Sequence, residues 1–172
     1  MAITYYKLIS NTLLSNNTSI EISGIPATFD DLVVFGSLRA TASNTMLVQN
    51  IKLNNNLSNY NRSEMYAQDS AFGAESNVTT SLERTVGRIP GSIASANTFN
   101  SFEMFIPKYS GSQNKIIHIR LSTSNNSSAA WDEWFTILHW DDTSAISTIA
   151  FETSTGNIAS GSTLSVYGVK YT

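Results

Sequence analysis

The stretch that decides the fold runs from Glu133 to Trp140 and reads EWFTILHW. Side chains on a β-strand point alternately to opposite faces of the sheet. One face of this stretch therefore carries two tryptophans, a threonine and a leucine, and the other carries Phe135, Ile137 and His139. Because both faces are largely apolar, the pattern is typical of a central strand, with one side in the core and the other covered by a loop, an adjoining element or a neighbouring subunit.

The same period of two recurs along the chain, and a helical period is almost absent. Polar stretches rich in Asn, Ser and Gly, which favour turns, separate the periodic segments. About ten strands in one chain predict an all-β fold, an antiparallel two-sheet β-sandwich with little helix. We expect these strands at Thr4–Ile9, Ser19–Ser23, Leu32–Ala40, Met46–Leu53, Val86–Ile89, Phe99–Ile106, Lys115–Ser122, Glu133–Trp140, Ser147–Phe151 and Thr163–Lys170.

The length of 172 residues suits a single domain that spans residues 1–172. The segment from Leu57 to Arg84 is the least regular part, because its polar and apolar residues follow no clean period. We expect a long irregular excursion at about 57–84, with room for one short helix. Long loops in compact domains are often functional, so this excursion is a candidate for contact with a neighbouring chain.

Charge is scarce in this chain. Lys and Arg number 10 against 13 Asp and Glu, the formal net charge is -3, and charged residues make up 13% of the total. Nucleic-acid binding normally needs a clustered basic footprint, which the sequence lacks. No apolar stretch approaches the roughly 18 residues that a membrane span needs, and nothing resembles a secretory signal. We therefore expect a protein that neither binds nucleic acid nor inserts into membranes.

Patterns that carry catalysis or metal binding are hard to find. The absence of cysteine excludes a disulfide framework, a thiolate metal site and a Cys nucleophile, and no nucleophile elbow, phosphate loop or zinc motif occurs. His118 and His139 each lie in an expected strand among apolar neighbours, which favours hydrogen-bonded structural histidines. The Asp141-Asp142 doublet is best interpreted as turn capping. We expect no enzyme, cofactor or metal, although a glycan hydrolase with two carboxylates far apart in sequence stays open.

Aromatic residues are the candidates for packing and recognition. In the Phe99–Ile106 stretch one face is apolar and the other is only half polar. Large exposed apolar patches are uncommon on monomers, so such strands either pack under the protein's own loops or meet another subunit. The candidate core or interface residues are Phe99, Phe105, Trp131, Trp134 and Trp140. The rings that would face a bound glycan are Tyr60, Tyr66 and Trp131.

Several segments form a recognisable series along the chain: Tyr6–Ile9 with Asn11–Leu13, Ile20–Pro26, Asp31–Val34, Ile51–Asn54, Ala96–Lys115 and Ile158–Lys170. In this order they resemble a family of small bacteriophage virion structural proteins, common in marine and cyanobacterial phages. The resemblance runs nearly end to end but does not extend to the 57–84 segment. It implies a jelly-roll-like β-sandwich displayed on a virion, and it implies no activity.

The resemblance and the residues together lead us to expect a non-enzymatic virion component, made in the host cytoplasm and assembled by burial of apolar and aromatic surface. The leading form is a capsid decoration or cement protein, a homotrimer that binds the major capsid protein or another virion protein. The alternative is a tail-fibre or receptor-binding knob whose aromatic rings recognise a host surface glycan. A fibre would usually add a coiled-coil shaft, and the chain has no heptads for one.

Overall fold

The computed structural model describes residues 3–69, 71–77, 84–126 and 131–171. In these residues the chain forms twelve β-strands and no helix, so no helix that could cross a membrane is found there. The strands are β1 (Ile3–Thr12), β2 (Ser19–Ser23), β3 (Asp31–Ser37), β4 (Met46–Leu53), β5 (Tyr60–Gln68), β6 (Ala71–Asn77), β7 (Thr85–Pro90), β8 (Ser101–Pro107), β9 (Lys115–Ser124), β10 (Trp131–Trp140), β11 (Thr148–Thr153) and β12 (Thr163–Tyr171).

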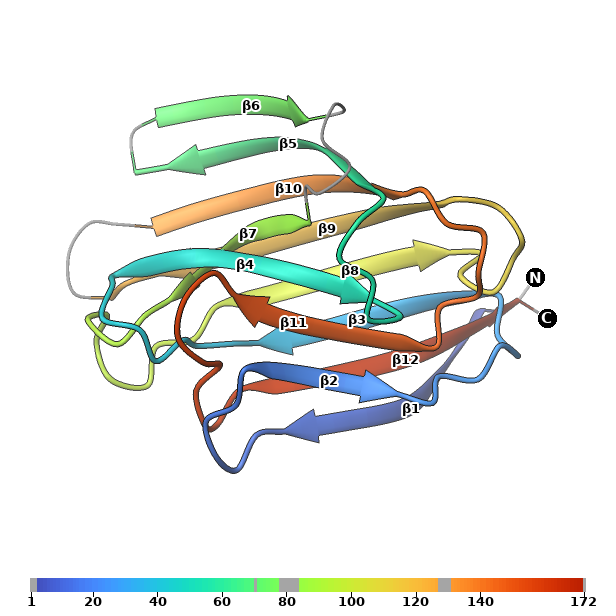
Figure 1. Cartoon of the computed structure of the whole chain (residues 1–172), viewed down its shortest axis with the longest axis horizontal. Coiled ribbons are helices and arrows are strands. Elements are labelled where there is room, and N and C mark those ends of the chain that lie inside the picture. Colours follow the sequence, from blue (N-terminus) through green and yellow to red (C-terminus); the bar gives the residue numbers. More distant parts are fainter. Residues whose placement is uncertain (1–2, 70, 78–83, 127–130, 172) are drawn as a thin grey trace.

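The strands form two antiparallel sheets of unequal width that pack face to face as a jelly-roll-like sandwich. The larger sheet has eight strands in the order β1-β12-β3-β8-β9-β10-β5-β6, and the smaller has four in the order β2-β11-β4-β7. The smaller sheet lies in front of the larger one in Figure 1, with its β7 edge against β9 and β10. The β5–β6 pair therefore extends past the smaller sheet, and the eight-stranded sheet has one covered face and one uncovered face.

Strict alternation in the central strands creates the core. In β9, buried and exposed side chains alternate along nearly the whole strand, with Ile117, Ile119 and Leu121 buried. The neighbouring β8 buries Phe102, whose ring packs against Phe151 of the smaller sheet with centroids 4.8 Å apart. These inward rows remove large apolar side chains from water, which is the main favourable term in folding.

One glycine is needed where two strands of the larger sheet pair. Gly36 of β3 lies opposite Phe102 of β8, and a Cβ at Gly36 would come within 2.2 Å of the Phe102 ring. The phenyl ring covers the glycine backbone, so a side chain there would displace a core residue.

All ten strands expected from the sequence are present, within a few residues at their ends. The prediction of an irregular excursion at about 57–84 is wrong for the described residues, because β5 and β6 pair there as an antiparallel hairpin. Residues 70 and 78–83 of this segment lie outside the described residues. The period of two is hidden because the inner face of β5 carries Arg62 and Glu64, which form an ion pair, instead of apolar side chains. Between the core-packed rings of Tyr60 and Tyr66, the two charges of this face are matched by each other.

Tyr60 anchors the start of β5 in the core. Its ring is fully buried and stacks on Trp140 with centroids 6.4 Å apart. The Leu53 backbone N–H donates to the Tyr60 hydroxyl at 2.8 Å, and that hydroxyl donates to the Asn56 carbonyl at 3.2 Å. The tyrosine thus ties the end of β4 and the following turn to the larger sheet.

Replacing Tyr60 with Phe removes the hydroxyl and leaves the buried Leu53 N–H without this acceptor. We expect a loss of about 1–3 kcal/mol in the free energy of unfolding, measured by urea denaturation. Tyr5→Phe is the matched control, because Tyr5 is exposed and the change should be nearly neutral. Equal effects of the two substitutions would contradict this role for Tyr60.

Stability should also fall at alkaline pH. Burial raises the pKa of Tyr60 to about 12 from its usual value of about 10. The unfolded tyrosine loses its proton near pH 10 while the folded one keeps it, so the stabilisation is complete below pH 10 and is lost as the pH rises toward 12. Urea denaturation across this range should show a shallower decline for Tyr60→Phe than for the wild type. If the free energy of unfolding fell equally steeply with pH in the variant and the wild type, groups other than Tyr60 would cause the loss of stability at alkaline pH.

Candidate functional site: the outer face of the eight-stranded sheet

The uncovered side of the eight-stranded sheet, called here the outer face, is the most distinctive surface of the molecule. All twelve described strands belong to the two sheets, so none of them lies over this face. It nevertheless displays several large apolar side chains. Phe35 is 46% exposed, Phe105 is 36% exposed and Met65 is 59% exposed. Clustered apolar side chains on a surface are typical of an interaction site.

Strand register places these side chains in two neighbouring rows that run across the sheet. The first row crosses β12, β3, β8, β9 and β10 and consists of Tyr167, Val33, Phe105, His118 and Ile137. The second crosses β3, β8, β9, β10 and β5 and consists of Phe35, Glu103, Arg120, Phe135 and Met65. Side chains directly opposite on paired strands lie close enough to interact, so each row is a continuous strip.

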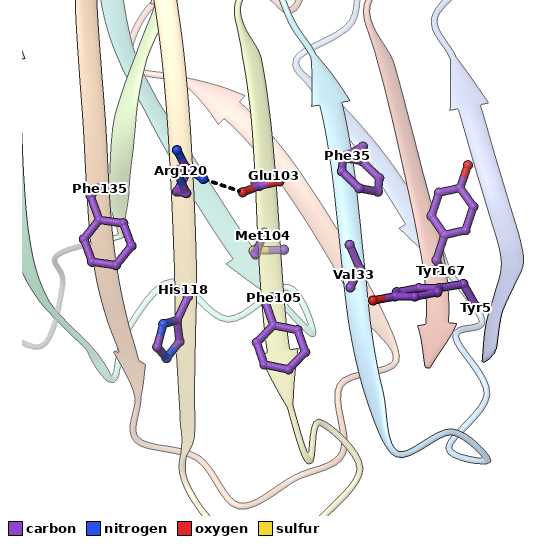
Figure 2. A pocket seen from close by; sticks show the side chains of 10 residues that line it. All are labelled: Tyr5, Val33, Phe35, Glu103, Met104, Phe105, His118, Arg120, Phe135 and Tyr167. Atoms are coloured by element: carbon purple, nitrogen blue, oxygen red, sulfur yellow. Dashed lines mark hydrogen bonds and ion pairs between the residues drawn. The ribbon is translucent and has the colours of Figure 1, made fainter. Parts of the chain in front are cut away.

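A groove of about 770 Å³ lies over these rows. Figure 2 shows Phe35, Phe105 and Phe135 on separate strands, with Tyr167 and Tyr5 at one side. Phe35 meets Tyr167 edge to face with ring centroids 5.8 Å apart, and Phe105 meets His118 in the same manner at 6.4 Å. Edge-to-face contacts are favourable arrangements of aromatic rings, and here they fix the walls of an open, largely apolar groove.

A single ion pair lies at the centre of the second row. Arg120 Nη1 of β9 is 3.4 Å from Glu103 Oε1 of β8, and both side chains are exposed, as the dashed line in Figure 2 marks. One row away, the Ser122 hydroxyl donates to Glu133 Oε1 at 2.9 Å. Exposed ion pairs contribute about 0–1 kcal/mol to stability, so the fold does not depend on this one. The pair places a carboxylate and a guanidinium next to each other among the aromatic side chains of the groove.

A second hollow, of about 530 Å³, continues the outer face toward β5 and β6. It shares Arg120 and Phe135 with the groove and adds Met65 and Phe72, whose side chains protrude into solvent. The outer face is therefore hollowed on both sides of Arg120 and Phe135, and Met65 and Phe72 are the exposed apolar side chains on its β5–β6 side.

The five candidate core or interface residues do not form one cluster. Trp134 and Trp140 lie in the core between the sheets, while Phe105 lies on the outer face. Trp131 is 43% exposed at the start of β10, and Phe99 is half-buried before β8, next to Gly161. Alternation in β8 and β10 thus sends rings that are close in sequence to opposite sides of the sheet.

The proposed glycan-facing set of Tyr60, Tyr66 and Trp131 is wrong as a site. Tyr60 is buried in the core, and Tyr66 is half-buried and stacks on Trp134 with centroids 4.8 Å apart. Only Trp131 is exposed, and it lies at the end of β10 that is remote from Tyr60. The inner face of β5 carries both tyrosines, so they point away from the outer face.

The two histidines also differ from expectation. His118 is exposed on the outer face, because the even positions of β9 point away from the core, and His139 is half-buried beside Ile137. In the Asp141-Asp142 doublet, Asp142 caps the following turn, because the Ser144 backbone N–H donates to Asp142 Oδ1 at 2.7 Å. Hydrogen bonds from Ser144 lower the pKa of Asp142. Within the described ranges no three His, Asp or Glu side chains gather as metal ligands.

Sequence reasoning missed Phe35, Arg120, Met65 and Tyr167 as site residues. Phe35, Arg120 and Tyr167 lie at outward positions of strands whose inward positions are largely apolar, whereas Met65 lies on β5, whose inner face carries Arg62 and Glu64. The only sequence signal was an aromatic or long side chain at a position where alternation expects a small polar one. Their meeting on one face depends on strand order, which the sequence does not display.

Comparisons with known proteins give only weak likenesses. The sequence matches no family model and no curated protein. Among solved structures, Caenorhabditis elegans galectin LEC-6 is 9% identical over 94% of this chain and 96% of its own, with a TM-score of 0.36. The VP2 subviral particle of infectious bursal disease virus is 14% identical over 96% of this chain and 41% of its own, with a TM-score of 0.15. These values assign neither a family nor a ligand.

The two faces of the larger sheet should respond differently to loss of a phenyl ring. Phe102→Ala empties a core position and should lower the free energy of unfolding by about 3–5 kcal/mol. Phe35→Ala removes a ring that is 46% exposed on the adjacent strand and should cost about 1 kcal/mol or less. Urea denaturation of both variants checks the contrast. A large loss for Phe35→Ala would mean that the outer face belongs to the core of the isolated chain.

Proposed function

We propose that this chain is a non-enzymatic virion structural protein that joins the particle through the outer face of its eight-stranded sheet. The observation that carries the proposal is the uncovered aromatic surface around Phe35, Phe105 and Phe135. The sequence resemblance to small phage virion proteins supports the location. The partners would be neighbouring virion subunits, either the major capsid protein or further copies of this chain, and capsid decoration is the leading form.

The chemistry of the outer face suits a protein interface. Aromatic residues, Met and Arg are enriched in interfaces, and a few buried rings near the centre supply most of the binding energy. Phe105 and Phe135 flank Arg120 near the middle of the sheet, and Met65 extends the apolar strip on β5. With charged residues at 13% of the chain, association would depend on apolar burial far more than on net charge.

A decoration role follows physically from such a surface. A protein that binds assembled capsids and not their dissociated subunits stabilises the particle by mass action. A standard interface buries roughly 800 Å² on each partner, which an uncovered face several strands wide can supply.

Glycan recognition by a tail-fibre or receptor-binding knob is the second candidate. The favouring observation is that Glu103 and Arg120 form polar hydrogen-bonding groups between the rings of Phe35, Phe105 and Phe135. Rings can stack on the apolar faces of sugars while a carboxylate and a guanidinium bind hydroxyl groups. This site would replace the set of Tyr60, Tyr66 and Trp131.

Copy number in the virion tests the proposal. Quantitative mass spectrometry of purified particles, calibrated against the major capsid subunit, should find on the order of hundreds of copies, because a decoration protein follows capsid symmetry. A few to a few tens of copies would move the protein to the tail or a vertex and favour the knob. Absence from purified particles would overturn the virion proposal.

A further inference from the structure

We infer that two copies of this chain pack outer face against outer face, about a two-fold axis that runs along the strands between β8 and β9. The inference rests on the proposed function in taking the outer face as an assembly surface. It names the occupant of that face as a second copy, in place of the homotrimer expected from the sequence, so contact with the major capsid protein would fall to other surfaces of the dimer.

The two-fold axis has a natural position in the larger sheet. The order β1-β12-β3-β8-β9-β10-β5-β6 places the β8–β9 boundary at its centre, with four strands on each side. Rotation about an axis along this boundary places β8 over the partner's β9, β3 over the partner's β10 and β12 over the partner's β5. Two-fold interfaces use the same patch on both subunits, so that patch must be complementary to itself.

Charge complementarity is the strongest argument for this axis. Glu103 and Arg120 are direct cross-strand partners on either side of the β8–β9 boundary. The rotation therefore brings Glu103 over the partner's Arg120 and Arg120 over the partner's Glu103. Four alternating charges form a closed square at the centre of the interface, in which each Glu103 carboxylate meets a guanidinium of each copy. Exclusion of water by the surrounding rings would strengthen these contacts.

The apolar rows match under the same rotation. In the row of Glu103 and Arg120, Phe35 lies over the partner's Phe135. In the neighbouring row, Val33 lies over the partner's Ile137, and on the other side Ser101 lies over the partner's Ser122. These pairs match in kind, and Phe105 lies over the partner's His118, whereas Glu133 in the Ser122 row faces the partner's β3, which carries no cation.

The rotation also gives Met65 of β5 an apolar neighbour. Met65 is 59% exposed, and the groove extends from β12 across β3 and β8 to β9 and β10. Because β5 lies over the partner's β12, Met65 reaches the margin of the partner's groove beside Phe35 and Tyr167. Methionine is flexible and polarisable and packs well against aromatic rings, so it suits this position.

Neighbouring positions of the axis are unfavourable. An axis between β3 and β8 would place Glu103 over the partner's Phe35, and one between β9 and β10 would place Arg120 over the partner's Phe135. Either arrangement buries a charge against an apolar ring without a new opposite charge, which costs free energy. The central axis is the one that pairs every charge in this row.

Sedimentation velocity of the full chain tests the dimer, with association expected below ~100 µM for an interface of standard size. Glu103→Arg should weaken the dimer at least tenfold, because it sets two guanidinium groups against each other across the axis. Adding Arg120→Glu to that variant should restore it. Glu21→Arg, the same charge change on exposed Glu21 of β2 in the smaller sheet, is the matched control and should leave the dimer unchanged.

A second measurement tests the register of the interface. The chain has no cysteine, so Ser63→Cys on β5 and Ser165→Cys on β12 each introduce one thiol on the outer face with almost no change in volume. The rotation brings β5 over the partner's β12, so these two positions meet across the interface while each stays far from its own copy in the partner. With one variant isotopically labelled, a short bis-maleimide reagent should link the two different variants more efficiently than it links either variant to itself. Mass spectrometry of the linked dimers distinguishes these products.

Each outcome decides the inference. The dimer is overturned by a chain that stays monomeric at ~100 µM, because a standard interface should associate in that range. It is also overturned by a trimer, by a dimer that Glu103→Arg leaves intact, or by equal linkage among all thiol pairs. The proposed function fails separately, through absence of the protein from purified virions. A virion protein that stays monomeric in solution would refute only the dimer, and a dimer absent from virions would refute only the virion role.

Discussion

The structure depends on one geometric constraint: a β-strand sends successive side chains to opposite faces, but the eight-stranded sheet has a partner sheet on one face only. The inward rows of β8, β9 and β10 supply the buried apolar contacts with the smaller sheet. The outward positions of the same strands then form a surface without a cover. Because Phe105, Phe135 and Phe35 occupy those positions, the requirement that builds the core also arranges an aromatic outer face.

The difference in width between the sheets explains where buried charge is placed. At the edge of the smaller sheet, Arg88 of β7 lies 3.4 Å from Asp132 of β10. Burial raises the pKa of Asp132, and the Arg88 guanidinium acts in the opposite direction. Beyond that edge, Arg62 and Glu64 form an ion pair on the inner face of β5. This pair lies on a strand that is hydrogen-bonded on both sides, and Arg62 also reaches Glu75 of the edge strand β6 at 3.5 Å.

The outer face combines two properties that are rarely found together on a monomer. Its rings favour removal from water, and its central ion pair requires that the covering surface bring opposite charges. The proposed second copy of the chain would meet both requirements through the β8–β9 boundary, and a glycan would meet them through stacking and hydroxyl groups. The two proposed occupants differ in their use of Met65, because its side chain on β5 would contribute to the face-to-face dimer and lies outside the rings around Glu103 and Arg120.

The sequence by itself determined the all-β class and ten of the strands, because alternation of apolar side chains is a local pattern. It also indicated that Glu133–Trp140 is central, with two apolar faces. It missed β5 and β6, whose inner face carries charge where a core strand carries apolar residues. Only the tertiary structure decided that Tyr60 is buried while Phe35, Arg120 and Met65 share a face. Strand order and sheet width are long-range properties, set by which inward rows pack together, and no local spacing records them.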